Sequence, residues 1–190
     1  MTQNDFIINL NLNKFNFNTI LLEKEVFNLK FLKYDNFFNP NLYKPDETVK
    51  WLSEVENWRA CDVDLNINTE CQKFYNSVTD IIKCDFLKPT TCRALYQKAG
   101  QNLIKHTHRR IPNQNHLCVN YICTKENAPI NFTNYGNINY KFSMLNTTEQ
   151  HSVPASSHDR YLIGVQYSYI NENANWNNIK SLLKNVQTDN

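Results

Sequence analysis

What this sequence lacks disfavours membrane-spanning and secreted classes of protein. No run of apolar residues is long enough to cross a membrane. Residues 1–30 alternate Asn, Lys, Phe and Ile, without the continuous apolar stretch that a signal peptide needs. We therefore expect a soluble, cytoplasmic protein with no membrane partner.

Paired cysteines of the metal-binding type are also absent. No two of the six cysteines are spaced as Cys-X-X-Cys, which disfavours a zinc site built from thiolates. Because no secretion signal is evident, disulfides are disfavoured as well. We expect free thiols, with Cys118 and Cys123 in the core of the protein rather than acting as ligands.

The sequence also lacks a long stripe of basic residues. The formal net charge is only +2, and the densest basic group, residues 105–110, is short and interrupted by histidines. Nucleic-acid binding needs a longer cluster of positive charge, so we expect no nucleic-acid partner. Hydrophobic residues make up 41% of the chain, enough for a real core. The length suits a single domain over residues 1–190.

The N-terminal half predicts extended segments followed by helices. In residues 1–44, short apolar patches alternate with Asn and Lys, which favours strands or extended arms. Pro45 opens a predicted helix that carries Trp58 on its apolar face. A second helix is predicted from Thr69, as N-cap, to about Cys84. Its apolar stripe has helical spacing and consists of Phe74, Val78, Ile81 and Ile82.

The character of the chain changes after Pro89, where short runs of β-forming residues are separated by polar turns. Regularly spaced strands of this kind indicate a sandwich or barrel. A short helix is expected over Trp176–Leu183, followed by a frayed end. The predicted strands are Ala94–Gln97, Asn102–His106, His116–Cys123, Ile130–Thr133, Ile138–Leu145 and Tyr161–Tyr169.

All five histidines lie in the second half of the chain. His106 and His108 are two residues apart, so an extended chain places both imidazoles on one side. Imidazole is the commonest neutral ligand for iron, zinc or copper. His151 precedes the last long strand and can complete a set of three ligands that leaves open coordination positions.

Three segments resemble the iron(II)/2-oxoglutarate-dependent oxygenases, with spacing most similar to the aspartyl/asparaginyl β-hydroxylase branch. AGQNLIKHTH, residues 99–108, is similar to the turn, strand and first metal histidine of that superfamily. KFSMLNTTEQH, residues 141–151, resembles the strand and loop that carry the distal histidine. HSVP at 151–154, followed by DRYLI at 159–163, resembles its His-then-Arg signature.

The resemblance covers about residues 93–169 and implies a mainly β fold with flanking helices. Its core would be a double-stranded β-helix, of the jelly-roll or cupin-like type, over residues 93–170. Residues 1–90 would supply N-terminal strands and supporting helices, and residues 171–190 a C-terminal tail.

The resemblance also implies a cofactor set of Fe(II) and 2-oxoglutarate. His106 and His151 would hold the metal, and Arg160 would grip the far carboxylate of 2-oxoglutarate. The planar guanidinium suits that role, because it can form two charge-assisted hydrogen bonds to one carboxylate. No catalytic side chain is expected beyond the metal ligands.

His108 departs from the pattern of most of the superfamily, which has Asp or Glu two residues after the first histidine. Either His108 is the third ligand, which we favour, or it points away and water fills the position. His116 is a candidate contact for the C1 end of 2-oxoglutarate, although a solvated strand-end histidine is the plainer interpretation. His158 lies in the predicted loop between His151 and Arg160.

The leading hypothesis is therefore an iron(II)- and 2-oxoglutarate-dependent oxygenase that hydroxylates a protein side chain, an amino acid or another small molecule. One alternative is a three-histidine dioxygenase that works without 2-oxoglutarate, in which Arg160 binds the carboxylate of the substrate. The other is a non-catalytic β-helix used for binding or assembly.

Overall fold

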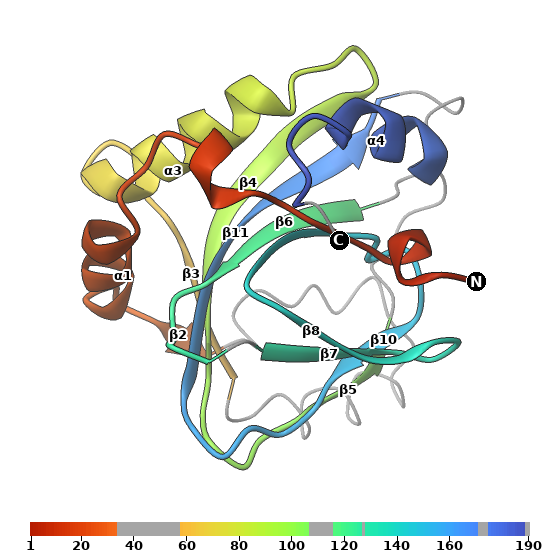
Figure 1. Cartoon of the computed structure of the whole chain (residues 1–190). Helices are drawn as coiled ribbons and strands as arrows, with labels where there is room; N and C mark the ends of the chain where they lie inside the picture. Colours follow the sequence, from red (N-terminus) through yellow and green to blue (C-terminus); the bar gives the residue numbers. More distant parts are fainter. Residues whose placement is uncertain (34–57, 107–115, 127, 171–174, 189–190) are drawn as a thin grey trace.

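The computed structural model describes residues 1–33, 58–106, 116–126, 128–170 and 175–188. Its strands form two antiparallel sheets that face each other (Figure 1). The larger sheet has the order β1 (Ile7–Asn9), β9 (Phe142–Leu145), β6 (His116–Ile122), β11 (Arg160–Tyr169), β4 (Leu87–Gln97), β3 (Trp58–Asp62) and β2 (Leu32–Lys33). The smaller sheet has the order β5 (Leu103–His106), β10 (His151–Val153), β7 (Ala128–Phe132) and β8 (Gly136–Tyr140).

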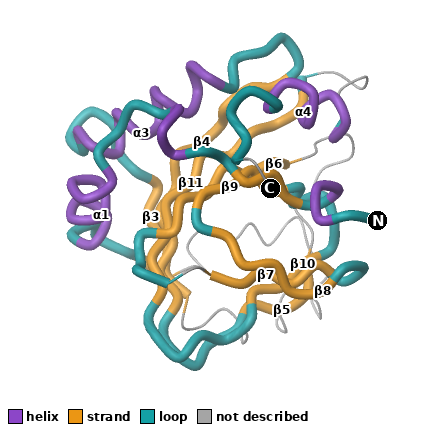
Figure 2. Tube along the Cα trace, in the orientation of Figure 1, coloured by secondary structure: helices purple, strands orange, loops and turns teal. Residues whose placement is uncertain are grey.

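Helices cover the outer face of the larger sheet, and the smaller sheet lies on its other side (Figure 2). The helical elements are η1 (Gln3–Asp5), η2 (Leu12–Lys14), α1 (Thr19–Phe27), α3 (Thr69–Ile81) and α4 (Trp176–Leu183), of which η1 and η2 are 3-10 turns. This is the mainly β architecture with flanking helices that the sequence predicted. In the part of the chain that the structure describes, no helix is long and apolar enough to span a membrane.

Alternation along the central strands divides the interior into two cores. On β6, Val119 and Tyr121 pack toward the helices, whereas Ile122 packs toward the smaller sheet. On β11, Ile163 belongs to the helix-side core and Leu162 to the core between the sheets. This period of two is what a sheet covered on both faces requires. The core between the sheets surrounds the cavity described below.

Residues 19–27 form α1, where the sequence predicted extended structure. The reason is local, because the Asn18 side chain accepts hydrogen bonds from the backbone N–H groups of Ile20 and Leu21 at 3.0 and 3.1 Å. Leu22 and Val26, one helical turn apart, are fully buried against the sheet. A good N-cap and two buried apolar residues were enough to make a helix of this short segment.

Asn18→Ala should lower the free energy of unfolding by about 1 kcal/mol, because two backbone N–H groups lose their acceptor. Urea unfolding followed by circular dichroism measures the change. Asn13→Ala is the matched control, since Asn13 is exposed and its side chain caps no helix. Equal losses in the two variants would contradict the capping role of Asn18.

Trp58 corrects the prediction of a helix opened by Pro45. It is the first residue of β3, pairs with Gln97 of β4 and is buried. A strand position suits it, because its ring faces the space between the two sheets. The rest of that predicted helix lies outside the described residues.

The second predicted helix is confirmed as α3, although Asn68, not Thr69, is the N-cap residue. Phe74, Val78 and Ile82 are buried as the stripe predicted, and Ile81 is partly buried. The Glu25 carboxylate of α1 accepts the N–H of Cys71 at 2.7 Å, which ties the two helices together. A carboxylate in this place also suits the positive end of the helix dipole.

Other strand predictions hold with shifted boundaries. The predicted strand Ile138–Leu145 is two strands, β8 and β9, which belong to different sheets because the chain changes direction at Lys141. β4 begins at Leu87, so Pro89 lies inside a strand rather than before it. Pro89 is tolerated there because it lies beyond the residues of β4 that pair with β3.

The C-terminal helix α4 has the predicted bounds, but residues 186–188 are not frayed. Asn11 donates its backbone N–H to Val186 at 2.8 Å, and Leu10 pairs with Gln187. All six cysteines are free, as predicted, and Cys118 and Cys123 are both buried.

Candidate functional site

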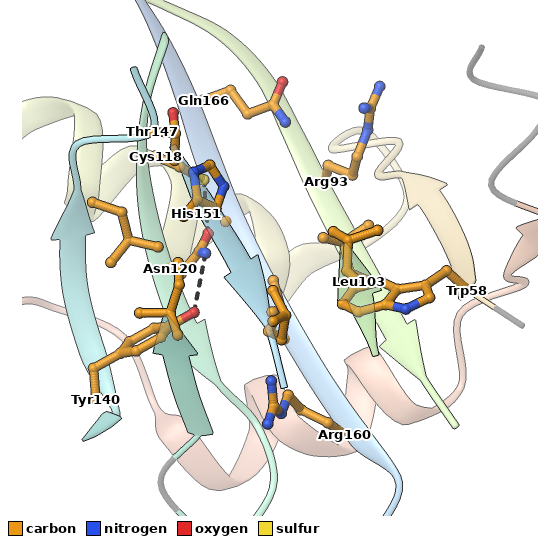
Figure 3. Close-up of a pocket in the computed structure, with 16 residues that line it drawn as sticks. Trp58, Arg93, Leu103, Cys118, Asn120, Tyr140, Thr147, His151, Arg160 and Gln166 are labelled. Atoms are coloured by element: carbon orange, nitrogen blue, oxygen red, sulfur yellow. Dashed lines mark hydrogen bonds between the residues drawn. The ribbon is translucent and has the colours of Figure 1, made fainter. Parts of the chain in front are cut away.

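A cavity of about 70 Å³ lies between the two sheets and contains two of the predicted site residues, His151 and Arg160 (Figure 3). Most of the surface that lines the cavity is formed by apolar atoms. Figure 3 shows Arg160 at one end of the cavity, Gln166 and Arg93 at the other, and His151 between them. The lining residues that carry polar side chains are Trp58, Arg93, Cys118, Asn120, Tyr140, Thr147, His151, Arg160 and Gln166.

The two predicted metal histidines are cross-strand partners. His151 begins β10, the second strand of the smaller sheet, and pairs with His106 at the end of β5. On its other side it pairs with Phe132 of β7, whose ring lies 5.8 Å from the imidazole. His151 is only 3% exposed. The register therefore brings together two positions that are 45 residues apart in the sequence.

Burial and one hydrogen bond set the chemical state of His151. Its Nδ1 lies 2.8 Å from the Glu149 carbonyl oxygen, which can only accept, so Nδ1 carries the proton. Burial lowers the pKa of the imidazole below its ordinary value. The ring is therefore neutral at pH 7, with its lone pair on Nε2. This is the tautomer that a histidine needs to bind a metal through Nε2.

The free energy of unfolding of the metal-free protein should fall as the pH drops below 6.5, the ordinary pKa of histidine. Burial lowers the pKa of His151 in the folded state, so the unfolded chain binds more protons in this range. A single titrating group changes the free energy of unfolding by at most about 1.4 kcal/mol per pH unit. Urea unfolding between pH 7.5 and 5 should show a weaker pH dependence in His151→Gln. The exposed His158 gives the control His158→Gln, and a similar reduction in both variants would contradict the assignment.

Arg160 is a buried cation with little to compensate its charge. It begins β11 nine residues after His151 and is 4% exposed. Its Nη1 lies 3.4 Å from the Pro129 carbonyl oxygen, which is a long hydrogen bond. Burial lowers the pKa of its guanidinium. Among the described residues no carboxylate pairs with Arg160, although burying an unpaired charge is costly. Such a residue is suited to binding an anionic ligand.

Tyr140, Asn120 and Cys118 form a buried hydrogen-bonded chain in the same cavity. From the sequence, Cys118 was expected only as a core residue, and no functional role was predicted for any of the three. The Cys118 thiol donates to Asn120 Oδ1 at 2.7 Å, and Asn120 Nδ2 donates to the Tyr140 hydroxyl oxygen at 3.3 Å. Burial raises the pKa of Tyr140 to about 12, so the phenol keeps its proton. The available signal was Asn120 itself, an amide within the mostly apolar stretch Leu117–Ile122.

The remaining predicted residues are only partly placed. His106 and His116 are located through their backbones, at the end of β5 and the start of β6. His116 pairs with Ser168, eight residues along β11 from Arg160, and its contact with 2-oxoglutarate stays a prediction. His108 lies outside the described residues. His158 is exposed, with its Nδ1 3.3 Å from a Glu126 carboxylate oxygen.

The described residues by themselves contain no group of three His, Cys, Asp or Glu side chains that could hold a metal ion. The predicted set of three includes His108, which is not among them.

No protein-family model matches the chain, and no curated protein sequence matches it. Its fold does match solved structures. A prolyl hydroxylase from Trichoplax adhaerens, in complex with a peptide fragment of the hypoxia inducible factor oxygen degradation domain, has a TM-score of 0.58 and 13% identity over 88% of this chain and 84% of that one.

Two further structures are more distant. A viral collagen prolyl hydroxylase from Paramecium bursaria Chlorella virus-1, in a 2OG complex, has a TM-score of 0.45 and 12% identity, over 77% of this chain and 99% of that one. HygX from Streptomyces hygroscopicus, with nickel, 2-oxoglutarate and hygromycin B bound, has a TM-score of 0.40 and 12% identity, over 68% and 80% of the two chains. At such identities the comparison with the Trichoplax protein establishes the fold, and the predicted double-stranded β-helix is confirmed.

Proposed function

We propose that this chain is an iron(II)- and 2-oxoglutarate-dependent oxygenase that hydroxylates a protein side chain, an amino acid or another small molecule. The observation that carries the proposal is Arg160, a buried guanidinium with no carboxylate partner among the described residues, in the same cavity as His151. The fold shared with a prolyl hydroxylase supports it. The aspartyl/asparaginyl β-hydroxylase branch stays a prediction.

The residues of the site fit a divalent metal such as iron(II). His151 is neutral, and the proton on Nδ1 places its lone pair on Nε2, the atom through which it would bind the metal. Directly paired positions on antiparallel strands have Cβ atoms about 5 Å apart, close enough for two residues to share one metal ion. His106 and His151 occupy such positions. We assign His108 as the third ligand, which would make the set all imidazole.

Arg160 and Tyr140 would together hold the distal carboxylate of 2-oxoglutarate. The guanidinium supplies a charged fork, and the Tyr140 hydroxyl, protonated at pH 7, supplies a further donor. Apolar neighbours such as Leu95 and Leu162 keep water from the carboxylate, which strengthens these hydrogen bonds. The substrate would approach from the other end of the cavity, where Gln166 and Arg93 lie.

When bound, iron(II) with 2-oxoglutarate supplies the oxygen activation that hydroxylates a C–H bond. The chain contributes position and shielding. His151 is held in one tautomer by the Glu149 carbonyl, and Arg160 is fixed at the start of a central strand. The smaller sheet covers one side of the cavity and would limit the access of water to the bound ligand.

The test is an anaerobic titration of the iron(II)-loaded protein with 2-oxoglutarate, followed by absorption spectroscopy. The wild type should develop an iron-to-ligand charge-transfer band that Arg160→Met develops only at far higher concentration. Arg59→Met is the control, because it removes a guanidinium from β3 that does not line the cavity.

The other outcomes point to different functions. If iron binds but 2-oxoglutarate changes nothing, the three-histidine dioxygenase without 2-oxoglutarate replaces this proposal. If neither Fe(II), Mn(II) nor Ni(II) binds, catalysis by this site is refuted and the domain is a binding or structural module.

A further inference from the structure

We infer that Asn120 is a positioning residue that fixes the Tyr140 hydroxyl as a hydrogen-bond donor to the anion held by Arg160. The inference rests on the proposed function and deepens it, because it states how the anion subsite selects its ligand. Asn120 would not touch the ligand. It would act through Tyr140.

The geometry of the chain Cys118–Asn120–Tyr140 supports this role. All three side chains are buried and line the cavity (Figure 3). The Cys118 Sγ lies 2.7 Å from Asn120 Oδ1, and Asn120 Nδ2 lies 3.3 Å from the Tyr140 hydroxyl oxygen. Two of the three residues come from β6 in the larger sheet and one from β8 in the smaller sheet. These hydrogen bonds therefore link the two sheets.

The direction of each hydrogen bond follows from the placement of the Asn120 amide, whose oxygen faces Cys118 and whose nitrogen faces Tyr140. The Cys118 thiol is protonated, since burial raises its pKa to about 12, and it donates to the amide oxygen of Asn120. The amide nitrogen of Asn120 must then face Tyr140, and it can only donate. The phenol oxygen therefore accepts from Asn120 and keeps its own proton for another acceptor. With the amide reversed, Asn120 Oδ1 would take that proton and the donor would be lost.

Gly164 provides the space in which the amide lies. It is the cross-strand partner of Asn120, on the next strand of the larger sheet. A Cβ atom at this position would lie 2.2 Å from Asn120 Oδ1 and 3.0 Å from Cys118 Sγ, so a side chain of any size displaces the amide. The backbone is not in the left-handed region here, and the need for glycine is purely one of space.

In a subsite built from Arg160 and a donating Tyr140, both side chains present donors to the ligand. The subsite therefore favours a ligand group that only accepts, such as a carboxylate, over a carboxamide, whose NH₂ would face these donors. Asn120 is the residue that prevents Tyr140 from turning into an acceptor. Loss of Asn120 should weaken binding of the carboxylate and also reduce the discrimination against the amide.

The test is a double-mutant cycle in the iron(II)-loaded protein under anaerobic conditions. The dissociation constant of 2-oxoglutarate is measured for wild type, Asn120→Ala, Tyr140→Phe and the double variant. Asn120→Ala should weaken binding about fivefold to tenfold when Tyr140 is present, as expected for loss of one oriented hydrogen bond to a charged group. In the Tyr140→Phe background, Asn120→Ala should change the dissociation constant of 2-oxoglutarate by less than about twofold.

Two further readouts separate positioning from a general structural effect. The charge-transfer band of the ligand-saturated variants should keep the wild-type wavelength, because the metal end of 2-oxoglutarate is untouched. The ratio of affinities for 2-oxoglutarate and its 5-carboxamide should fall in Asn120→Ala. Asn139→Ala is the matched control, on an exposed position of β8 next to Tyr140.

Gly164→Ala offers an independent variant that keeps Asn120 but displaces its amide, and it should weaken 2-oxoglutarate binding to a similar extent. Equal effects of Asn120→Ala with and without the Tyr140 hydroxyl would overturn the inference. So would an unchanged affinity ratio. If wild type and Arg160→Met bind 2-oxoglutarate equally, the proposed function itself fails. If only Arg160→Met is impaired, that function stands and the role of Asn120 is refuted.

Discussion

Arg160→Met should abolish the stabilisation that 2-oxoglutarate gives to the metal-loaded protein, yet leave the ligand-free protein as stable as the wild type or more stable. A ligand at a hundred times its dissociation constant raises the free energy of unfolding by about 2.7 kcal/mol. Without the guanidinium this increment should vanish. In the ligand-free protein Arg160 is a buried charge with no carboxylate partner among the described residues, so an apolar side chain of similar length removes a desolvation penalty.

Thermal or urea unfolding with and without 2-oxoglutarate measures both effects, with Mn(II) as a metal that resists oxidation. Arg59→Met is again the control and should keep the full ligand-dependent increment. A loss of more than about 1 kcal/mol in ligand-free Arg160→Met would show that the guanidinium stabilises the fold. It would then be a structural residue, and the proposed anion site would be refuted.

His151→Ala should weaken metal binding by more than the factor of about 10 to 100 that is typical when a residue supporting a ligand is removed. The reason is that His151 would itself be a ligand, through Nε2. Calorimetric titration of the metal-free protein with Ni(II) gives the dissociation constant. His158→Ala is the control, because that side chain is exposed in the loop between His151 and Arg160.

A fall in metal affinity within or below that range in His151→Ala would contradict the proposed coordination. Because His151 is buried and its ring lies near Phe132, folding of the variant must be checked in the absence of metal. The conservative variant His151→Gln fills most of the same space and should show the same loss of metal affinity. A variant that folds and binds Ni(II) normally would refute a metal site at His151.

The parts of the fold that were predictable have a strong periodic signal of their own. α3 has an apolar stripe over several turns, and α4 has a short apolar face between polar residues. The central strands β6 and β11 are rich in β-forming residues on both faces, since helices cover one face and the smaller sheet the other. These patterns depend on local sequence alone.

The elements that were not predicted depend on tertiary contacts. α1 is held by the Asn18 cap and by burial of Leu22 and Val26, which cannot be read from the alternation that precedes it. β10 has only three residues and is a strand because it pairs with β5 on one side and β7 on the other. Trp58 has an apolar side chain that suits a helix face as well as a strand between two sheets.

In the candidate site, the resemblance of residues 151–163 to a His-then-Arg signature implied that His151 and Arg160 share one site, and both line one cavity. The residues around Arg160 could not be inferred in the same way. Tyr140 and Asn120 meet only because β8 and β6 come from sheets that face each other. Gly164 leaves room for the Asn120 amide because it has no Cβ atom. This effect depends on the pairing of Gly164 with Asn120 on the neighbouring strand. Contacts of this kind are set by the register of strand pairing and by the way the two sheets face each other, neither of which can be read from the sequence.

The position of β11 in the larger sheet has a consequence for how the protein folds. β11 lies between β6 and β4, which are separated in the sheet and both made earlier during synthesis. The two halves of the sheet cannot join until residues 160–169 have left the ribosome, and most pairings then form over long sequence separations, which slows folding. The strand that unites the sheet is also the one that carries Arg160. A chain truncated before it would thus lack both the strand that joins the two halves of the sheet and the residue that we propose binds the anion.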